Sequence, residues 1–404
     1  MKRREFLTAG ALAAGGALLG SQVTFAGMAR GTKPRFVFII LRGALDGLEA
    51  VPAFGDPGYA GLRGELAIGR PGTNGGALPL DGLFGLHPAL SSMHQSYAAR
   101  ELIVFHAVAS PYRSRSHFDG QNVLETGYPQ PHAVETGWLN RALAALPGTL
   151  APEKERGISI APTAPLVMRG PAAVTSWSPS RLAPLDDDTL QRISELYSRD
   201  PMLAQKLAEA LAAEAIAEEP RPGTLLAQRG KPEAQYAEVA RAAARFLGQA
   251  DGPQVAVFDT TGWDTHFNEG NARGQLAARL AALDTALGAL KDGLGPVWRD
   301  TAVLLATEFG RTVAENGTRG TDHGTATAAW LLGGAVNGGR VVTDWPGLSP
   351  RALYQDRDLK PTLDLRAVMK GVLAEHLGVP ARALESQVFP DSRDARPVRG
   401  LLRA

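Results

Sequence analysis

Carboxylate and imidazole side chains stand beside two short apolar runs late in the chain. Glu308 directly follows the run 302–307, and Asp322 and His323 come shortly before the run 328–332. Carboxylate oxygen and imidazole nitrogen both bind divalent cations such as zinc and manganese. We therefore predict that Glu308, Asp322 and His323 are metal ligands.

An Asp-x-His motif follows another apolar run, residues 255–259. Asp264 and His266 are two positions apart, so in an extended segment their side chains point the same way and could hold one ion. The motif is common by chance, and its place after a predicted strand is what favours a metal site. We predict both residues as ligands.

Asp46 follows the apolar run 35–41 in a loop flanked by Gly43 and Gly47. It could be a further metal ligand, or it could be a turn aspartate, which is common before glycine. Both interpretations stay open at this point, and we include Asp46 among the predicted ligands.

The segment 110–119 is rich in hydroxyl and guanidinium groups. A helix that begins near His117 would place free N–H groups and the positive end of the helix dipole beside Ser116. Ser116 is then either a plain N-cap or a nucleophile aimed at a bound anion, with Ser114 as its rival.

Two arginines alternate with these serines. Arg113 and Arg115 could bind phosphate or sulfate oxygens through charge-assisted hydrogen bonds, or they could be solvated loop charges. We predict the first role, and we assign the catalytic functions to Ser116, Arg113 and Arg115.

Short apolar runs bounded by turn residues must position these groups. Runs of this length are typical of buried strands in a parallel sheet, and open α/β sheets bind ligands outside the carboxyl ends of their strands. We therefore expect the polar groups to converge at one sheet edge. The predicted strands are residues 35–41, 102–108, 255–259, 302–307 and 328–332.

Helical spacing of apolar residues is clear in residues 275–290 and 362–377. Residues 185–250 are rich in Ala, Glu and Arg, with apolar residues at helical spacing and a break at 220–223. We interpret this part as a helical excursion, a cap or side lobe inserted in one α/β domain that spans residues 30–404.

Bulk composition is that of an ordinary globular protein with ample core. The chain has 404 residues, no cysteine and a net charge of +1, of which residues 1–26 contribute +2. The remainder is therefore nearly neutral and gives no basis for nucleic-acid binding. Without cysteine, disulfides, iron–sulfur clusters, thiolate zinc and cysteine nucleophiles are excluded.

The first 26 residues resemble an export signal rather than folded structure. Arg3 and Arg4 precede a mild apolar segment, residues 11–19, and small residues then allow cleavage near Ala26. This pattern is typical of a twin-arginine signal. The alternative, a membrane anchor, is disfavoured because the segment is well below the roughly 20 residues of a spanning helix. We expect a periplasmic or secreted protein.

Several motifs together resemble the bacterial family called domain of unknown function 1501. They are LRGALDGLEAVP, SRSHFDGQNVLETG, TGWLNRAL, GWDTHFN, ATEFGRT and TDHGTA, and they cover nearly the whole exported chain. The family is placed in the alkaline phosphatase/sulfatase-like superfamily. The resemblance implies a three-layer α/β sandwich with a mixed, mostly parallel central sheet and a two-metal site at its carboxyl edge.

The resemblance also assigns roles, with departures. Phe309 stands where the usual histidine would follow the acid at 308, and the spacing of Ser110-Pro111-Tyr112-Arg113 does not match the sulfatase signature. Formylglycine-type sulfatase chemistry is therefore disfavoured. The resemblance matches Asp46, Asp264, His266, Glu308 and His323 to metal ligands, with Asp322 as an extra carboxylate, and Ser116 to the segment of the nucleophile.

We therefore expect an exported metal-dependent hydrolase of phosphate or sulfate esters. It would use a metal-activated serine, one or two zinc or manganese ions and a small-molecule or polymer ester as substrate. The alternative is a non-catalytic periplasmic binding or assembly protein on the same fold, whose 185–250 lobe could contact a protein partner. A redox role is weakest, because haem-attachment and dinucleotide motifs are absent.

Overall fold

All five predicted apolar runs form strands of one sheet in the computed structural model. The structure describes residues 33–147, 155–179, 187–198, 200–217 and 232–403, and the predicted export signal lies outside them. The sheet order is β10-β4-β9-β8-β1-β7-β5-β6, with β11 also paired to β4. The strands are β1 (Arg35–Arg42), β4 (Leu102–Ala109), β5 (Gly157–Ile160), β6 (Val174–Trp177), β7 (Val255–Thr261), β8 (Thr301–Ala306), β9 (Thr327–Leu332), β10 (Arg340–Val342) and β11 (Leu363–Asp364).

One strand runs against the others. β1 pairs in parallel with both β7 and β8, whereas β9 is antiparallel to both β8 and β4. The sheet is therefore mixed and mostly parallel, as the resemblance implies, whereas the expectation that the run 328–332 is a parallel strand is wrong. Because β9 is reversed, its beginning lies at the edge where β1, β4, β7 and β8 end.

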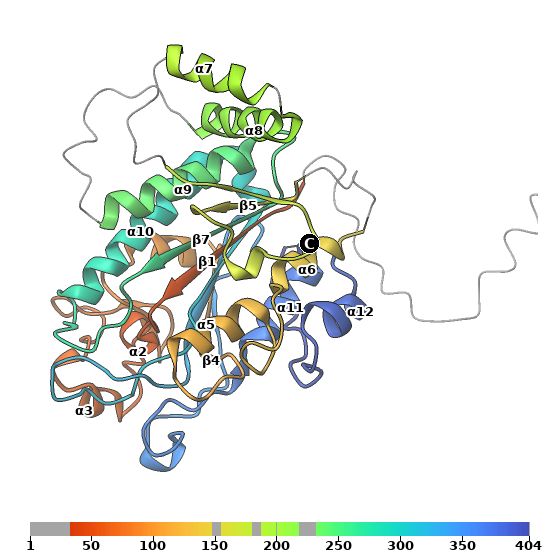
Figure 1. The fold of residues 1–404 in the computed structure, drawn as a ribbon. Coiled ribbons are helices and arrows are strands. Elements are labelled where there is room, and N and C mark those ends of the chain that lie inside the picture. Colours follow the sequence, from red (N-terminus) through yellow and green to blue (C-terminus); the bar gives the residue numbers. More distant parts are fainter. Residues whose placement is uncertain (1–32, 148–154, 180–186, 199, 218–231, 404) are drawn as a thin grey trace, which may run out of the picture. The chain divides into compact units, whose positions relative to one another are not determined.

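Helices cover both faces of this sheet, which makes the described structure a three-layer α/β sandwich (Figure 1). β1 shows the division, since Val37 and Ile39 belong to one core and Phe36 and Phe38 to the other, as the alternation of a strand requires. The first face is covered by α4 (Ser91–Ala98), α9 (Pro232–Gly248) and α10 (Gln275–Leu294). The second is covered by α5 (His117–Thr126), α6 (Trp138–Ala144), α11 (Leu365–Glu375) and α12 (Ala381–Ala383).

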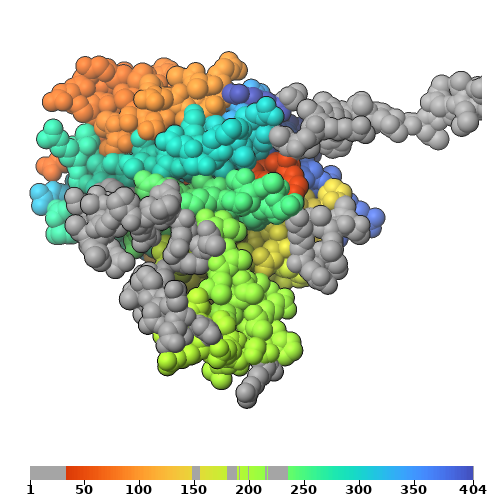
Figure 2. Space-filling model, turned by 90° about the horizontal axis from the view of Figure 1, so that it is seen from above, coloured from red at the N-terminus to blue at the C-terminus, as the bar shows by residue number. Residues whose placement is uncertain are grey.

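The region predicted as a helical excursion contains α7 (Asp187–Tyr197), α8 (Pro201–Ala217) and α9. α9 is not peripheral, because Tyr236, Ala240 and Leu247 are buried in the first core. α8 contacts α9, and the lime surface of α7 and α8 lies beside the green of α9 in Figure 2. Of the described helices, none combines the length and apolar character needed to cross a membrane.

Candidate metal centre

The chemistry-bearing residues meet at the edge described above. β1, β4, β7 and β8 end there and β9 begins there, so segments far apart in sequence come together. The first turn of α5, directly after the β4 loop, brings one further histidine to the same place. The residues that this edge gathers are His117, Asp264, His266, Glu308, Asp322 and His323.

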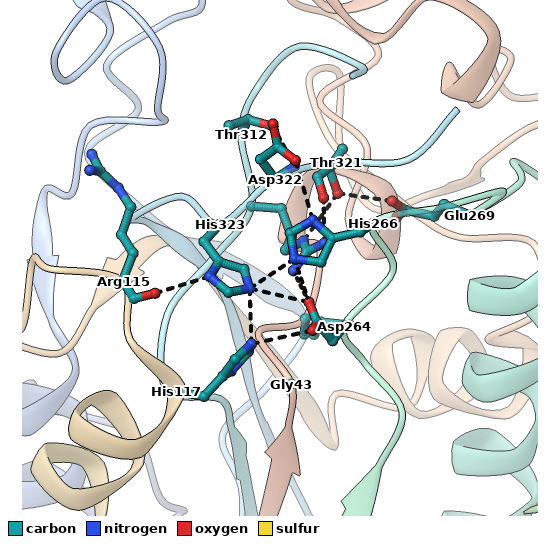
Figure 3. Close-up of polar contacts among 12 residues, drawn as sticks. Gly43, Arg115, His117, Asp264, His266, Glu269, Thr312, Thr321, Asp322 and His323 are labelled. Carbon is teal, nitrogen blue, oxygen red and sulfur yellow. Dashed lines mark hydrogen bonds and ion pairs between the residues drawn. The ribbon is translucent and has the colours of Figure 1, made fainter. Parts of the chain in front are cut away.

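Three imidazole rings converge on one another and on one carboxylate (Figure 3). The Nε2 atom of His323 lies 2.9 Å from Nε2 of His117 and 3.0 Å from Nε2 of His266. Asp264 Oδ1 lies 3.0 Å from His266 Nε2 and 3.3 Å from His323 Nε2, and its Oδ2 lies 3.5 Å from His117 Nε2. Four potential ligands from three segments of the chain therefore lie close together around Nε2 of His323 and the carboxylate of Asp264.

The hydrogen bonds behind the rings fix their tautomers. Nδ1 of His323 lies 3.0 Å from the carbonyl oxygen of Arg115, which can only accept, so Nδ1 carries the proton. Nδ1 of His117 lies 2.8 Å from Glu308 Oε1 and donates to it. In neutral rings both Nε2 atoms then present lone pairs to each other at 2.9 Å, which requires a positive charge between them.

Either a proton or a metal ion could supply this charge. The hydrogen bond to Glu308 raises the pKa of His117, so a proton could sit between His117 and His323. One proton, however, serves only one pair of nitrogens. A metal ion could contact more of these atoms, because candidate ligand atoms of His117, Asp264 and His323 all lie within 4.8 Å of one another, and His266 Nε2 lies 3.0 Å from His323 Nε2.

Glu308 orients a ligand rather than facing the cluster. Its Oε1 accepts from the Gly43 amide at 2.9 Å, from His117 and from Gln121 Nε2 at 3.1 Å, and its Oε2 accepts from Thr307. Burial raises the pKa of Glu308, but these hydrogen bonds outweigh it and hold the pKa below its ordinary value. These contacts favour orientation of His117 as the role of Glu308 over direct ligation of an ion, and the predicted ligation stays a prediction.

Asp322 has the same relation to His266. Its Oδ1 lies 3.2 Å from Nδ1 of His266 and 3.1 Å from Nδ2 of Asn316, which also donates to the carbonyl of His266. Such carboxylate contacts fix the ring orientation of metal-binding histidines and raise their basicity. The structure thus brings Asp322 to the site, but behind a ligand.

Arg311 holds Asp264 from the buried side. Its Nη1 lies 2.5 Å from Asp264 Oδ1, and its side chain is fully buried. Burial raises the pKa of Asp264, but its contacts with His323 and with the Arg311 guanidinium outweigh burial and lower the pKa far below its ordinary value. Asp264 is therefore ionised and suited to a cation. Arg311 was not among the sequence-predicted residues.

Asp46 is used elsewhere. It caps the short helix α2 (Gly47–Ala50), since Oδ1 accepts from the amides of Leu48 and Glu49, and Oδ2 lies 2.7 Å from Arg63. Of the two interpretations of the sequence, the local structural one agrees with these contacts. We leave Asp46 outside the ligand set, because both of its oxygens are already bound within a buried ion network.

The two arginines predicted to bind an anion also donate hydrogen bonds to protein acceptors. Arg113 donates to the carbonyls of Ser110 and Tyr112 in its own loop. Arg115 donates to Asp358 at 2.9 Å, and Figure 3 shows its guanidinium pointing away from the histidines. These contacts favour a structural role for both groups, and their assignment to ester oxygens stays a prediction. The contribution of Arg115 is its carbonyl, which orients His323.

Ser116 is the residue before helix α5, as expected, and the helix begins at His117. The Ser116 hydroxyl makes no capping hydrogen bond to the helix amides, while its own amide donates to the Tyr112 hydroxyl at 3.3 Å. The residue that sequence reasoning missed is His117 itself. Its position in the sequence could have indicated this role. His117 lies where a helix is predicted to begin after the β4 loop, and such a position lies near the carboxyl ends of the strands.

Behind the site lies a buried ion network. Glu49, Arg63 and Glu269 have no exposed surface, and Arg63 lies 3.1 Å from Glu49. Glu269 Oε2 accepts from the Thr321 hydroxyl at 2.9 Å, and that hydroxyl accepts from Arg311. Burial raises the pKa of Glu269 to about 8, with the charge of Asp46 adding to the effect and Arg63 opposing it.

Stability should therefore fall as pH rises from about 5 to about 8. The pKa of Glu269 in the folded state lies above its ordinary 4.5, so the folded protein holds a proton that the unfolded chain has released. This contribution is complete below the ordinary pKa and is lost as pH rises through the folded value, with a slope of at most about 1.4 kcal/mol per pH unit.

Urea unfolding at several pH values measures this slope. Glu269→Gln keeps an acceptor for Thr321 but cannot titrate, so its profile should be flatter than that of the wild type. The difference between the two proteins isolates Glu269 from the histidines that titrate in the same range. Glu65→Gln, an exposed change, is the control, and equal slopes for wild type and Glu269→Gln would contradict the prediction.

Comparison with known proteins supplies the family. The family model described as "Protein of unknown function (DUF1501)" matches residues 89–388, which include all three converging histidines and Asp264. The family resemblance of the sequence is thereby confirmed. No curated protein matches the chain by sequence.

Solved structures similar to the chain include members of the superfamily that the resemblance implies. A phosphonate monoester hydrolase of Agrobacterium radiobacter is 12% identical over 77% of this chain and 70% of its own, with a TM-score of 0.40. A protein in the alkaline phosphatase superfamily from Vibrio parahaemolyticus is 12% identical (86% and 68% covered, TM-score 0.39). The C-terminal periplasmic domain of EcEptC from Escherichia coli, in complex with Zn, is 10% identical (90% and 88% covered, TM-score 0.39). At sequence identities this low, the chemistry of this chain has to be inferred from its own side chains.

Proposed function

The chain belongs to the DUF1501 family, and we propose that it is a metal-dependent hydrolase of phosphate or sulfate esters. One observation supports this proposal above all others. Two imidazole nitrogens, on His117 and His323, face each other at 2.9 Å with their opposite nitrogens donating, and His266 and Asp264 close the same space. Such a donor set is built for a cation.

Zinc fits this donor set better than manganese. Three imidazole nitrogens and one carboxylate oxygen match the ligands and the number that zinc takes, whereas manganese favours sites rich in oxygen. His117, His266, His323 and Asp264 would hold a single ion. With a further coordination position open to the ester, the bound ion would polarise an ester oxygen and neutralise charge that develops on it.

The chain's own residues would supply orientation and a nucleophile. Glu308, Asp322 and the carbonyl of Arg115 hold the three rings with Nε2 toward the ion. Ser116 lies one residue from His117 at the start of α5, where free amides and the helix dipole favour an anionic oxygen. We assign the nucleophile to Ser116 rather than to Ser114, which is exposed.

A second function is favoured by one specific observation. The guanidinium groups of Arg113, Arg115 and Arg311 all donate hydrogen bonds to protein acceptors, which is typical of arginines with a structural role. A non-catalytic binding or assembly protein, with zinc as a structural ion, agrees with this arrangement. The two functions differ in turnover and share metal binding.

Turnover by the zinc-loaded full chain decides between the two functions. We expect hydrolysis of p-nitrophenyl phosphate or p-nitrophenyl sulfate, and a loss of at least about 100-fold in kcat for Ser116→Ala with zinc content unchanged. Ser194→Ala on the surface of α7 is the control. Protein that binds zinc and turns over neither ester would support the non-catalytic function instead.

We also propose export by the twin-arginine route. The proposal is based on Arg3 and Arg4 and on the short apolar segment after them. Fusion of residues 1–26 to a folded reporter tests it. Reporter in the periplasm that is lost on Arg3→Lys/Arg4→Lys supports the route, and export that survives this change contradicts it.

A further inference from the structure

Two exposed phenylalanines stand beside the metal centre. Phe118 is 86% exposed and directly follows His117, and Phe267 is 60% exposed and directly follows His266. Among the described residues the other large exposed apolar side chains all lie on α7 and α8. Those side chains are Leu196, Met202, Leu203 and Leu211. Within the described part of the chain and outside these two helices, the large apolar side chains left in water are thus the two that follow histidines of the site.

The backbone around Phe267 holds this ring outward. The carbonyl of Phe267 accepts from Gln275 Nε2 at 3.0 Å, and the amide of Asn268 donates to the carbonyl of Thr318 at 3.0 Å. Asn268 has a φ of 44°, a left-handed conformation that is uncommon for a residue other than glycine and that clusters at functional sites. The loop therefore fixes the backbone from which the ring extends.

Phe118 is held in a similar way. It is the second residue of α5, whose start is tied to the Tyr112 hydroxyl through the amide of Ser116. Arg115, with a φ of 60°, turns the chain into the helix while its carbonyl binds His323. The same turn thus orients a ligand of the ion and presents an aromatic ring to solvent.

The more exposed residues of the cluster are those on the segment that carries Phe267. The side chains of Asp264 and His266 are each 42% exposed, whereas those of His117 and His323 are 26% and 25% exposed. Consecutive Cα atoms are about 3.8 Å apart, so each phenylalanine begins next to a ligand. A ring that extends from an ester at the ion therefore has an exposed phenylalanine within reach on each of two neighbouring backbone segments.

We propose that Phe118 and Phe267 bind a flat-faced ring carried by the substrate next to its ester. This inference rests on the proposed hydrolase function and narrows its substrate class to phosphate or sulfate esters of ring-bearing alcohols, as opposed to small alkyl esters. Aromatic side chains bind such faces through their apolar area and through stacked or edge contacts. An aryl ring and a sugar ring both offer a flat apolar face, and the experiment separates them.

The test compares esters that differ only in the group they carry. For the zinc-loaded full chain, kcat/KM is measured with phenyl phosphate, glucose 6-phosphate and methyl phosphate, and with the corresponding sulfates. We expect Phe118→Ala/Phe267→Ala to lower kcat/KM about three- to tenfold for the ring ester that is the better substrate, with methyl phosphate changed less than about twofold. Leu196→Ala, which removes an exposed side chain of α7, is the matched control.

A binding measurement distinguishes failure of this inference from failure of the proposed function. Titration of phenylphosphonate and methylphosphonate into wild type and double variant follows binding without turnover, and zinc content and Tm are measured for both proteins. If esters are hydrolysed without preference for a ring, or equally by the double variant, the ring site is refuted and the hydrolase function stands. If no ester is hydrolysed but phenylphosphonate binds more weakly to the variant, the ring site stands and the hydrolase function fails. No ring-dependent binding and no turnover refute both.

Discussion

His323→Ala should lower the affinity of the protein for Zn²⁺ by at least about 100-fold, since second-sphere changes alone cost 10- to 100-fold. The Nε2 atom of His323 is the centre of the cluster, because it lies within 3.3 Å of His117, His266 and Asp264. Its loss leaves the other two rings without the donor that links them. Competition with a chelator of known affinity, together with metal content after dialysis, measures the change.

His132→Ala is the matched control for this experiment. His132 is a histidine with 66% of its side chain exposed, and its contact is with Asp119 instead of the cluster. Zinc affinity should be unaffected by its loss. Equal zinc affinities of wild type and His323→Ala would contradict the proposed metal centre and the chemistry that depends on it.

Arg63→Ala should lower the free energy of unfolding by about 3–5 kcal/mol. Arg63 is fully buried and lies 2.7 Å from Asp46 and 3.1 Å from Glu49. Burial raises the pKa of Glu49 well above its ordinary value even with Arg63 present. Removal of the guanidinium would leave the buried carboxylate of Asp46 without its cation. An unpaired buried charge lowers the free energy of unfolding more than replacement of the whole pair by apolar residues would.

Urea denaturation at constant pH measures this loss, and zinc should be absent so that metal binding does not contribute. Arg299→Ala removes an arginine whose side chain is 75% exposed in its pair with Asp300, and should change stability by less than about 1 kcal/mol. A similarly small effect of Arg63→Ala would mean that the buried network is not a stabilising element. The role given to Asp46 as a structural residue would then lose its basis.

The strands were predictable because burial imposes a local pattern. The runs 35–41 and 102–108 are almost wholly apolar, and they became β1 and β4, buried in the interior of the sheet. α10 begins at Gln275 as expected, although it ends at Leu294, beyond the predicted 290. Element type follows from composition and period, whereas element ends depend on tertiary contacts.

The closeness of Asp264 and His266 could also be predicted from the sequence, because residues two positions apart on an extended segment share a face. The position of His117 was harder to predict from the sequence. Its role follows from where α5 begins and how the preceding turn, with Arg115 at a φ of 60°, aims the first helical residues. A single sequence gives no measure of that orientation.

By itself, then, the sequence determined the buried strands, the residue types able to hold a cation and their approximate meeting at one sheet edge. Only the tertiary structure decided that β9 is antiparallel, which brings His323, a residue before a strand, to residues that follow strands. It also decided that Glu308 and Asp322 orient rings and that Asp46 binds Arg63. The reason is that each carboxylate has few lone pairs, and which partners occupy them depends on contacts between residues distant in the chain.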